Sequence, residues 1–252
     1  MTRRHAALTA TAEAIGLAAR TQGQGISQRS SRVMAHLARR LMLGVADPPI
    51  RVDVGGIAIE MPFSHQLPFH LRAHPDYGLN IGRLSKAITD VLPHATGIDV
   101  GANVGDTAAT IRIYCRMPLL CVEGNSAFLP FLRENADVVG DIEVDESYVA
   151  TAPGAISGHV ETVGGTARIV DDVEGQVTTT TLAEVIARHP RFRTPALVKI
   201  DTDGFDCRII TAHVDFWRSQ QPVLFFEYDP KLQEPSRRAE EARVFETLRG
   251  CG

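Results

Sequence analysis

The sequence predicts an α/β protein built on a mostly parallel sheet. Short apolar segments alternate with helical segments between residues 97 and 229, a glycine-bearing turn follows the first apolar segment, and acidic residues end several of them. Parallel strands joined by right-handed helical crossovers bring their carboxyl ends to one edge of the sheet. Ligands in such folds bind at that edge, so we expect the functional site there.

Residues 1–45 predict a helical extension. Alanine-rich residues 5–21 favour one helix, and a second is expected over 30–43, ending at Gly44. Apolar side chains of the second helix share one face, which we expect to pack on the main domain or to bind a partner. They are Val33, Met34, Leu37 and Leu41.

The same 45 residues are basic, with seven arginines against one acidic residue, Glu13. Such a segment can contact nucleic acid or an anionic surface. We favour a basic helical face that packs near the acidic remainder, because no aromatic residues lie between the arginines to stack on bases. No nucleic-acid partner is therefore predicted.

Residues 46–95 predict a hairpin and an acceptor-side segment. Alternating apolar positions in 50–54 and 57–61 flank Gly55-Gly56, which is typical of a β-hairpin. Residues 62–80 are dense in polar, aromatic and imidazole groups, and we expect some of them to line an acceptor pocket. The candidates are His65, His70, His74, Tyr77 and Asn80. A helix is expected over 83–92.

A strand over 97–100 leads into the turn that we expect to bind the ligand, and a helix follows over 107–114. Dinucleotide-binding turns carry G-x-G-x-x-G and rest a pyrophosphate on free N–H groups of the helix N-terminus. This turn carries G-x-N-x-G, and Asp106 falls in the first turn of the helix. A carboxylate there repels phosphate. It suits S-adenosylmethionine, which has sulfonium and ammonium groups and no phosphate.

Two acidic residues are expected to hold this cofactor. Asp99 ends the first strand, within reach of the ammonium group directly or through water. Glu123 ends the next apolar run, 119–122, 24 residues after Asp99. That spacing is close to the one at which ribose hydroxyls are held in this fold class. The two acids in this order favour an adenosyl site over a structural turn with a solvated carboxylate.

The rest of the chain continues the alternation of strands and helices. The expected elements are a helix over 126–138, a strand over 142–150, a glycine-rich hairpin insertion over 155–170, a helix over 182–188, a strand over 195–201, a helix over 206–212, a strand over 222–227 and a helix over 236–248. Acidic residues end four strands and are expected to converge on one cleft: Asp99, Glu123, Asp201, Asp203, Glu227 and Asp229.

These motifs resemble the FkbM-type methyltransferase family, a branch of the Rossmann-like class I S-adenosylmethionine-dependent enzymes. The resemblance rests on Asp99–Thr107, Val122–Asn125, Leu197–Gly204 and Leu224–Glu227, which occur in the family's order. It implies O-methylation of a hydroxyl on a small molecule, secondary metabolite or saccharide, by a cofactor-binding domain over 96–252. The residues implied in cofactor binding are Asp99, Gly101, Asn103 and Gly105 around the methionine portion, Glu123 at the ribose, and Asn125 of the same motif.

Methyl transfer requires an acceptor oxygen in line with the departing sulfur and a group that takes its proton. Asp201 and His65 are the candidate bases. A divalent metal is an alternative that the spacing does not require. It would be bound by Asp201 or Asp203 together with Glu227 or Asp229, since hard oxygen ligands suit Mg²⁺.

Two other classes of function remain open. One is a non-catalytic module that uses the same fold for binding or scaffolding, through the helices of residues 1–45. The other is a nicotinamide-dependent oxidoreductase, which the missing third glycine and Asp106 disfavour.

The sequence predicts a cytoplasmic protein without a membrane span. It contains no apolar run of about 18 residues and no continuous apolar leader. Its four cysteines form no C-x-x-C pair, which favours reduced thiols and disfavours a zinc site. Relatives usually add a final antiparallel strand pair after the last helix. We expect this pair to be missing, which would leave residues 223–226 as an apolar edge in a fragment or in a protein completed by a partner.

Overall fold

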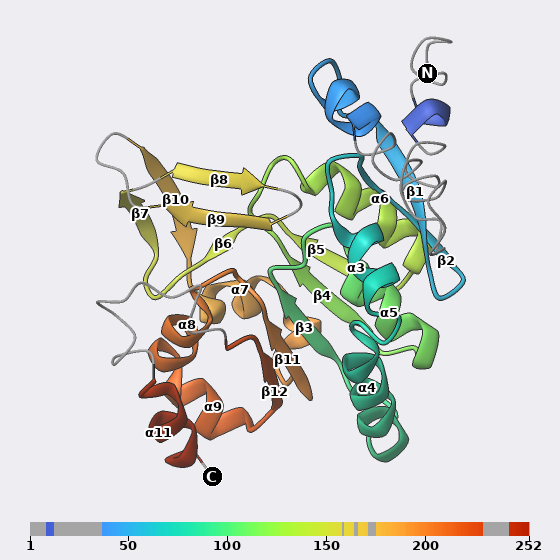
Figure 1. The fold of residues 1–252 in the computed structure, drawn as a ribbon. Helices are drawn as coiled ribbons and strands as arrows, with labels where there is room; N and C mark the ends of the chain where they lie inside the picture. Colours follow the sequence, from blue (N-terminus) through green and yellow to red (C-terminus); the bar gives the residue numbers. More distant parts are fainter. Residues whose placement is uncertain are drawn as a thin grey trace. The chain divides into compact units, whose positions relative to one another are not determined.

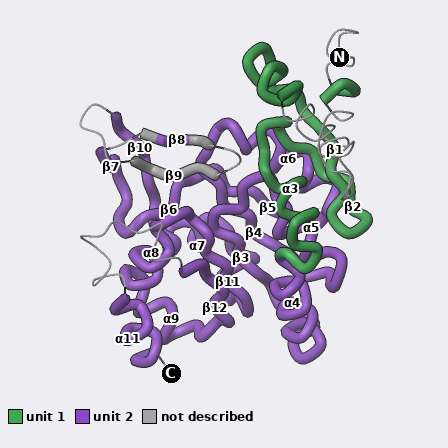
Figure 2. Tube along the Cα trace, viewed as in Figure 1, with its two compact units in different colours: residues 1–77 green, residues 78–252 purple. Residues whose placement is uncertain are grey.

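The computed structural model divides the chain into two compact units, residues 1–77 and 78–252 (Figure 2). The boundary between the two units falls inside the predicted 46–95 segment. The division of the chain into segments 1–45, 46–95 and 96–252 remains a prediction. The structure describes residues 9–12, 37–157, 159–163, 166–170, 175–228 and 242–251.

The first unit contains the predicted hairpin. β1 (Pro49–Val54) pairs antiparallel with β2 (Ile57–Pro62). Gly55 and Gly56 make the turn with φ values of +59° and +93°, which glycine adopts without steric cost. Alternate residues of β1 are buried, as the apolar pattern predicts.

A short helix that the sequence does not predict follows the hairpin. α3 (Leu67–Ala73) begins with a proline in its first turn, where the missing N–H removes no helical hydrogen bond. His65 precedes it and is buried, and its Nδ1 accepts a hydrogen bond from the backbone N–H of Leu67 at 3.1 Å. His65 therefore supports the start of α3.

Residues 37–43 are helical, as predicted, but the predicted apolar face is not covered at its described residues. Leu37 and Leu41 are 49% and 67% exposed. Arg39 packs instead: its guanidinium lies 5.4 Å from the ring centroid of Phe63 and 5.1 Å from that of Phe69. Val33 and Met34 lie outside the described residues.

We expect Arg39→Met to destabilise the first unit by about 1–3 kcal/mol, because it removes the cation–π contacts and two hydrogen bonds. Arg39 Nη2 donates to the carbonyl oxygens of Phe63 (3.1 Å) and Ser64 (2.7 Å). Chemical denaturation measures the loss. Arg40→Met changes an exposed arginine of the same helix and should leave stability within about 0.5 kcal/mol of wild type. Equal losses in both variants would show that the packing of Arg39 is unimportant.

A five-stranded parallel sheet forms the centre of the second unit (Figure 1), in the order β12-β11-β3-β4-β5. The chain runs outward from β3 through β4 to β5 and later returns to the other side of β3 as β11 and β12. The strand order therefore reverses between β3 and β11, and the predicted Rossmann-like sheet is confirmed. The strands are β3 (Gly97–Val100), β4 (Leu119–Val122), β5 (Ile142–Asp145), β11 (Leu197–Ile200) and β12 (Val223–Phe226).

Helices cover both faces of this sheet (Figure 1). One face carries Ile98, Val100, Val198 and Ile200, which belong to a buried apolar cluster with α7, α8, α9 and α11. These helices are α7 (Leu182–Arg188), α8 (Asp206–Ala212), α9 (Val214–Gln220) and α11 (Val244–Arg249). The opposite face is covered by α4 (Leu79–Val91), α5 (Asp106–Tyr114) and α6 (Leu129–Val139).

The predicted strand over 142–150 is two strands. β5 ends at Asp145, and β6 (Tyr148–Val149) leaves the main sheet to join a second one, in the order β6-β10-β7. Its other strands are β7 (Gly154–Ser157) and β10 (Gln176–Thr180). β8 (His159–Val163) and β9 (Thr166–Val170) form an antiparallel hairpin. The predicted hairpin insertion is therefore present.

Other differences from prediction lie at element boundaries. α4 begins four residues before the predicted start, after Gly78 with φ of +74°. The sequence does not predict α9, nor the 3₁₀ turn η1 (Pro190–Phe192). Within the described residues, β12 lies at an edge of the main sheet. Most of the predicted 236–248 helix lies outside the described residues. No described helix is long and apolar enough to cross a bilayer.

Candidate ligand-binding site

The turn after β3 has a backbone that only particular residues adopt easily. Gly101, Asn103 and Gly105 have φ values of +79°, +52° and +85°. A Cβ atom built on Gly101 would lie 1.9 Å from the carbonyl oxygen of Asp201, which follows β11. Glycine at position 101 therefore lets the turns after β3 and β11 touch.

Glu123 joins two loops through its carboxylate. Oε2 accepts a hydrogen bond from the N–H of Asn103 at 2.9 Å, and Oε1 accepts one from the N–H of Asn125 at 2.7 Å. Burial raises the pKa of Glu123, although these backbone donors oppose the shift. The acid that ends β4 thus fixes the turn after β3 as well as its own turn.

Gly124 allows an aromatic ring to lie directly against the backbone after Glu123. A Cβ atom at Gly124 would lie 2.3 Å from the ring of Tyr148. Burial, and secondarily the charge of Glu123, raise the pKa of Tyr148 to about 12. The phenol of Tyr148 is therefore protonated at neutral pH.

A buried ion-pair network lies beneath the turn after β3. Lys199 Nζ is 3.0 Å from Asp99 Oδ1 and 3.2 Å from Asp201 Oδ2. Burial raises the pKa of Asp99 to about 6, with Lys199 opposing the shift. Burial alone would lower the pKa of Lys199, but the carboxylates of Asp99 and Asp201 outweigh it and raise this pKa. Lys199 is thus a charged ammonium group shared by two carboxylates.

Asp206 organises the loop that follows β11. Its carboxylate accepts hydrogen bonds from the N–H groups of Thr202 and Gly204, each at 3.3 Å, and from Thr202 Oγ1 at 3.1 Å. Asp203 in this loop has φ of +52°. Burial raises the pKa of Asp206 to about 6, and the charge of Asp201 adds to the shift.

A pocket opens at the carboxyl ends of β3, β4 and β11, where the strand order reverses. It contains about 570 Å³ of space, part of it open to solvent. Among its described lining residues are three carboxylates, Glu123, Asp201 and Asp203, and no basic side chain. The other lining residues are Val100, Gly101, Asn103, Val122, Gly124, Phe128, Ser147, Tyr148, Val149, Thr202 and Phe205.

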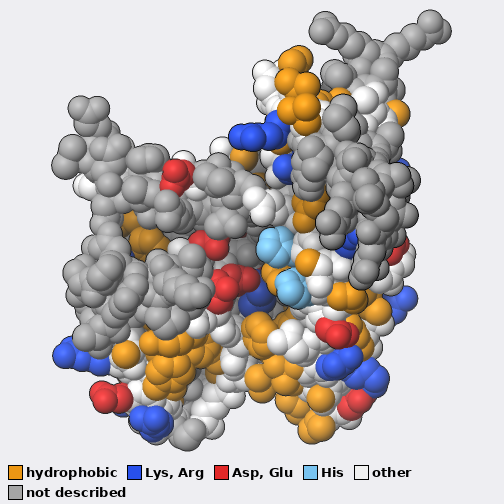
Figure 3. Space-filling model, in the orientation of Figure 1, with side chains coloured by type: hydrophobic (Ala, Val, Ile, Leu, Met, Phe, Trp, Pro, Cys, Tyr) orange, Lys and Arg blue, Asp and Glu red, His pale blue; other side chains and the backbone are white. Residues whose placement is uncertain are grey.

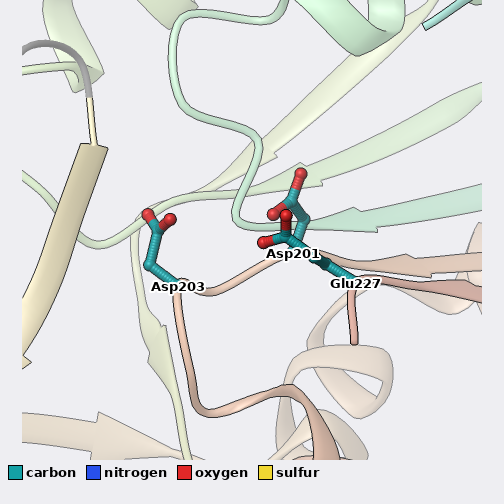
Figure 4. Close-up of side chains that lie close together, drawn as sticks. All are labelled: Asp201, Asp203 and Glu227. Atoms are coloured by element: carbon teal, nitrogen blue, oxygen red, sulfur yellow. The ribbon is translucent and has the colours of Figure 1, made fainter. Parts of the chain in front are cut away.

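Three acidic residues approach one another beside this pocket. One carboxylate oxygen from each of Asp201, Asp203 and Glu227 lies within 4.8 Å of the others. Figure 4 shows the side chains of Asp201 and Glu227 next to each other, with Asp203 farther along the loop that follows β11. Figure 3 shows acidic side chains gathered near the centre of the face that is turned toward the viewer. Such hard oxygen donors suit Mg²⁺. Lys199 already places one positive charge against Asp201.

The structure brings together part of the predicted site. Gly101, Asn103, Glu123 and Asp201 line one pocket. The other predicted cofactor residues are not among its lining residues: Asp99 pairs with Lys199, Gly105 is the N-cap of α5, and Asn125 donates to Glu123. His65 belongs to the other compact unit, and Asp229 lies outside the described residues.

Three residues of this region are not predicted as site residues. Lys199 carries a sequence signal, a lone lysine within the apolar strand Leu197–Ile200, which indicates a charged partner on a neighbouring strand. Asp206 and Tyr148 carry no comparable signal, because their contacts with the loop after β11 and with Gly124 depend on the folded chain.

A five-stranded parallel sheet of this order, with a glycine-bearing turn after its central strand, is the sheet of a Rossmann-like ligand-binding fold and agrees with that of methyltransferases. The model of the methyltransferase FkbM domain matches residues 99–252. The chain belongs to this family of methyltransferases. None of the curated proteins and none of the solved structures matches it.

Proposed function

We propose that the protein transfers a methyl group from S-adenosylmethionine to a hydroxyl of a small molecule, secondary metabolite or saccharide. The family supports methyl transfer, and the pocket supports the choice of donor. A cytoplasmic site of action is part of the proposal. It is supported by the four cysteines, all of which are free thiols.

The charge of the pocket lining carries the proposal. Three carboxylates and no described basic side chain face the space, and Asp106 occupies the first turn of α5. A polyphosphate or dinucleotide would meet repulsion where such ligands normally meet free N–H groups and positive charge. The sulfonium and ammonium groups of S-adenosylmethionine would be attracted.

The arrangement of the lining residues suits an adenosyl ligand. We assign Gly101 and Asn103 to the methionine portion and Glu123 to the ribose, whose hydroxyls can donate to a carboxylate that has lone pairs left after two backbone contacts. Apolar surface for the adenine ring is available from Val100, Val122, Phe128, Tyr148 and Phe205.

Asp201 is our first candidate for the base that takes the acceptor's proton. It lines the pocket, and its side chain is 40% exposed. In the reaction the acceptor oxygen forms a bond to the methyl carbon as the carbon–sulfur bond breaks, S-adenosylhomocysteine leaves, and the hydroxyl proton passes to the carboxylate. His65 remains a second candidate. If a divalent metal is required, Asp201, Asp203 and Glu227 would hold it and lower the pKa of the hydroxyl.

The proposal is tested by calorimetry with Glu123→Gln. Wild type should bind S-adenosylmethionine and S-adenosylhomocysteine but not NAD. The variant should bind the adenosyl ligands about tenfold more weakly or worse. The carboxylate accepts a hydrogen bond from two backbone N–H groups, and the amide NH₂ of glutamine would face one of these donors with a second donor. Glu60→Gln, on β2 in the other unit, should leave binding unchanged.

Three results would contradict the proposal. Unchanged affinity in Glu123→Gln would remove Glu123 from the site, and tight NAD binding would favour an oxidoreductase. Cofactor binding without methyl transfer to any member of a broad panel of hydroxyl compounds, with and without Mg²⁺, would favour a non-catalytic binding module.

A further inference from the structure

Lys199 stands between a buried carboxylate and a carboxylate of the pocket. Its side chain is 8% exposed, and the side chain of Asp99 is 1% exposed. Asp201 lines the pocket and is 40% exposed. The ammonium group of Lys199 therefore connects the interior of the sheet to a charged group that faces the ligand.

The sheet register fixes this arrangement. Asp99 and Lys199 are direct partners on the adjacent parallel strands β3 and β11. Lys199 and Asp201 are two residues apart on one extended segment, so their side chains point to the same side of the sheet. Asp99 Oδ2 has no hydrogen-bond partner among the described residues. Lys199 is thus the cation that compensates the charge of Asp99.

We propose that Lys199 is a positioning residue that holds the carboxylate of Asp201 in the pocket, where its charge attracts the cationic groups of the bound cofactor and from which it can take the acceptor's proton, with Asp99 holding Lys199 in turn. This inference rests on the proposed function. It gives Asp99 a different role from the one implied by the family resemblance: the carboxylate acts through Lys199 and does not contact the ligand. Loss of Lys199 should then affect binding only as long as Asp201 carries its carboxylate.

A purely structural role for Lys199, such as tying β11 to β3, makes a different prediction. In that case the loss caused by Lys199→Met would be independent of the residue at position 201. A double-mutant cycle separates the two roles, because it measures whether the effect of one residue requires the other.

The experiment measures the dissociation constant of S-adenosylmethionine by calorimetry for wild type, Lys199→Met, Asp201→Asn and the double variant. We expect Lys199→Met to weaken binding about tenfold in the wild-type background and less than about twofold in the Asp201→Asn background, as for residues that share one network. Equal losses in both backgrounds would overturn the inference. Lys86→Met, which changes an exposed lysine of α4, should not affect binding.

Lys199→Met leaves the carboxylate of Asp99 buried without a cation, which can prevent folding. Thermal unfolding of each variant detects this. The cycle is then repeated with Asp99→Asn and Lys199→Met made together as one change against Asp201→Asn. No arm of that cycle strands a buried charge, because Lys199 keeps Asp99 as its partner when Asp201 alone is changed. The same criterion applies to that cycle. Failure of the wild-type protein to bind S-adenosylmethionine would overturn the proposed function itself, and this is known before any variant is made.

Discussion

Gly101→Ala should abolish binding of S-adenosylmethionine and destabilise the fold. Position 101 has φ of +79°, which costs an alanine about 1–2 kcal/mol. The added Cβ would also lie 1.9 Å from the carbonyl oxygen of Asp201, a backbone atom that cannot rotate away. The turns after β3 and β11 must therefore move apart, which displaces Asn103 and Asp201 from the pocket that they line together.

Gly140→Ala is the matched control. Gly140 follows α6 with φ of +75° and ψ of 152°, a backbone region essentially restricted to glycine, and no described atom lies within 4 Å of the position that an added methyl group would take. This variant should lose about 1–3 kcal/mol of stability through backbone strain alone and keep the affinity of wild type. Calorimetry and thermal unfolding compare the two variants. If Gly101→Ala binds the cofactor as wild type does, the two turns do not need their close approach.

The central part of the fold is predictable from the sequence because its signals are local. β4 and β12 are short apolar runs, and β3 and β11 are apolar apart from one charged residue each. The N-cap of α7 is Thr181, in a capping box completed by Glu184. Where local sequence patterns give the wrong element, the structure depends on pairing with a strand that is distant in the sequence. Residues 142–150 have one continuous strand pattern, but they divide because Tyr148 and Val149 pair with β10 and not with the main sheet.

The site is predictable in its location but less so in the roles of its residues. The acids at the strand ends identify the edge where the pocket lies, and Glu123 and Asp201 do face it. Asp99 has the same sequence signal but is turned toward Lys199, 100 residues away along the chain. Contacts between residues that are distant in the sequence decide which carboxylate faces a ligand and which one pairs with a buried lysine. A single sequence does not reveal these contacts.

The pH dependence of stability should identify Asp206 as a carboxylic acid whose ionisation is unfavourable in the folded protein. Its pKa is about 6 in the folded state and 3.8 in an exposed aspartate. Between these two pH values the unfolded chain releases the proton while the folded protein retains it, so rising pH favours unfolding. The contribution of Asp206 is therefore complete below about pH 4 and is lost by about pH 7, a change on the order of 3 kcal/mol.

Asp206→Asn removes this proton while keeping a carbonyl oxygen that can accept from the loop of Thr202 and Gly204. Urea unfolding of wild type and variant between pH 4 and pH 7.5 measures the difference in their free energies of unfolding. Wild type should lose stability relative to the variant as the pH rises through this range, whereas Asp99, present in both proteins, cancels from the difference. Asp90→Asn, on the exposed end of α4, controls for the loss of a surface carboxylate. A difference that stays constant with pH would mean that Asp206 ionises as easily in the folded loop as in the unfolded chain. Its three hydrogen-bond donors would then compensate fully for its burial.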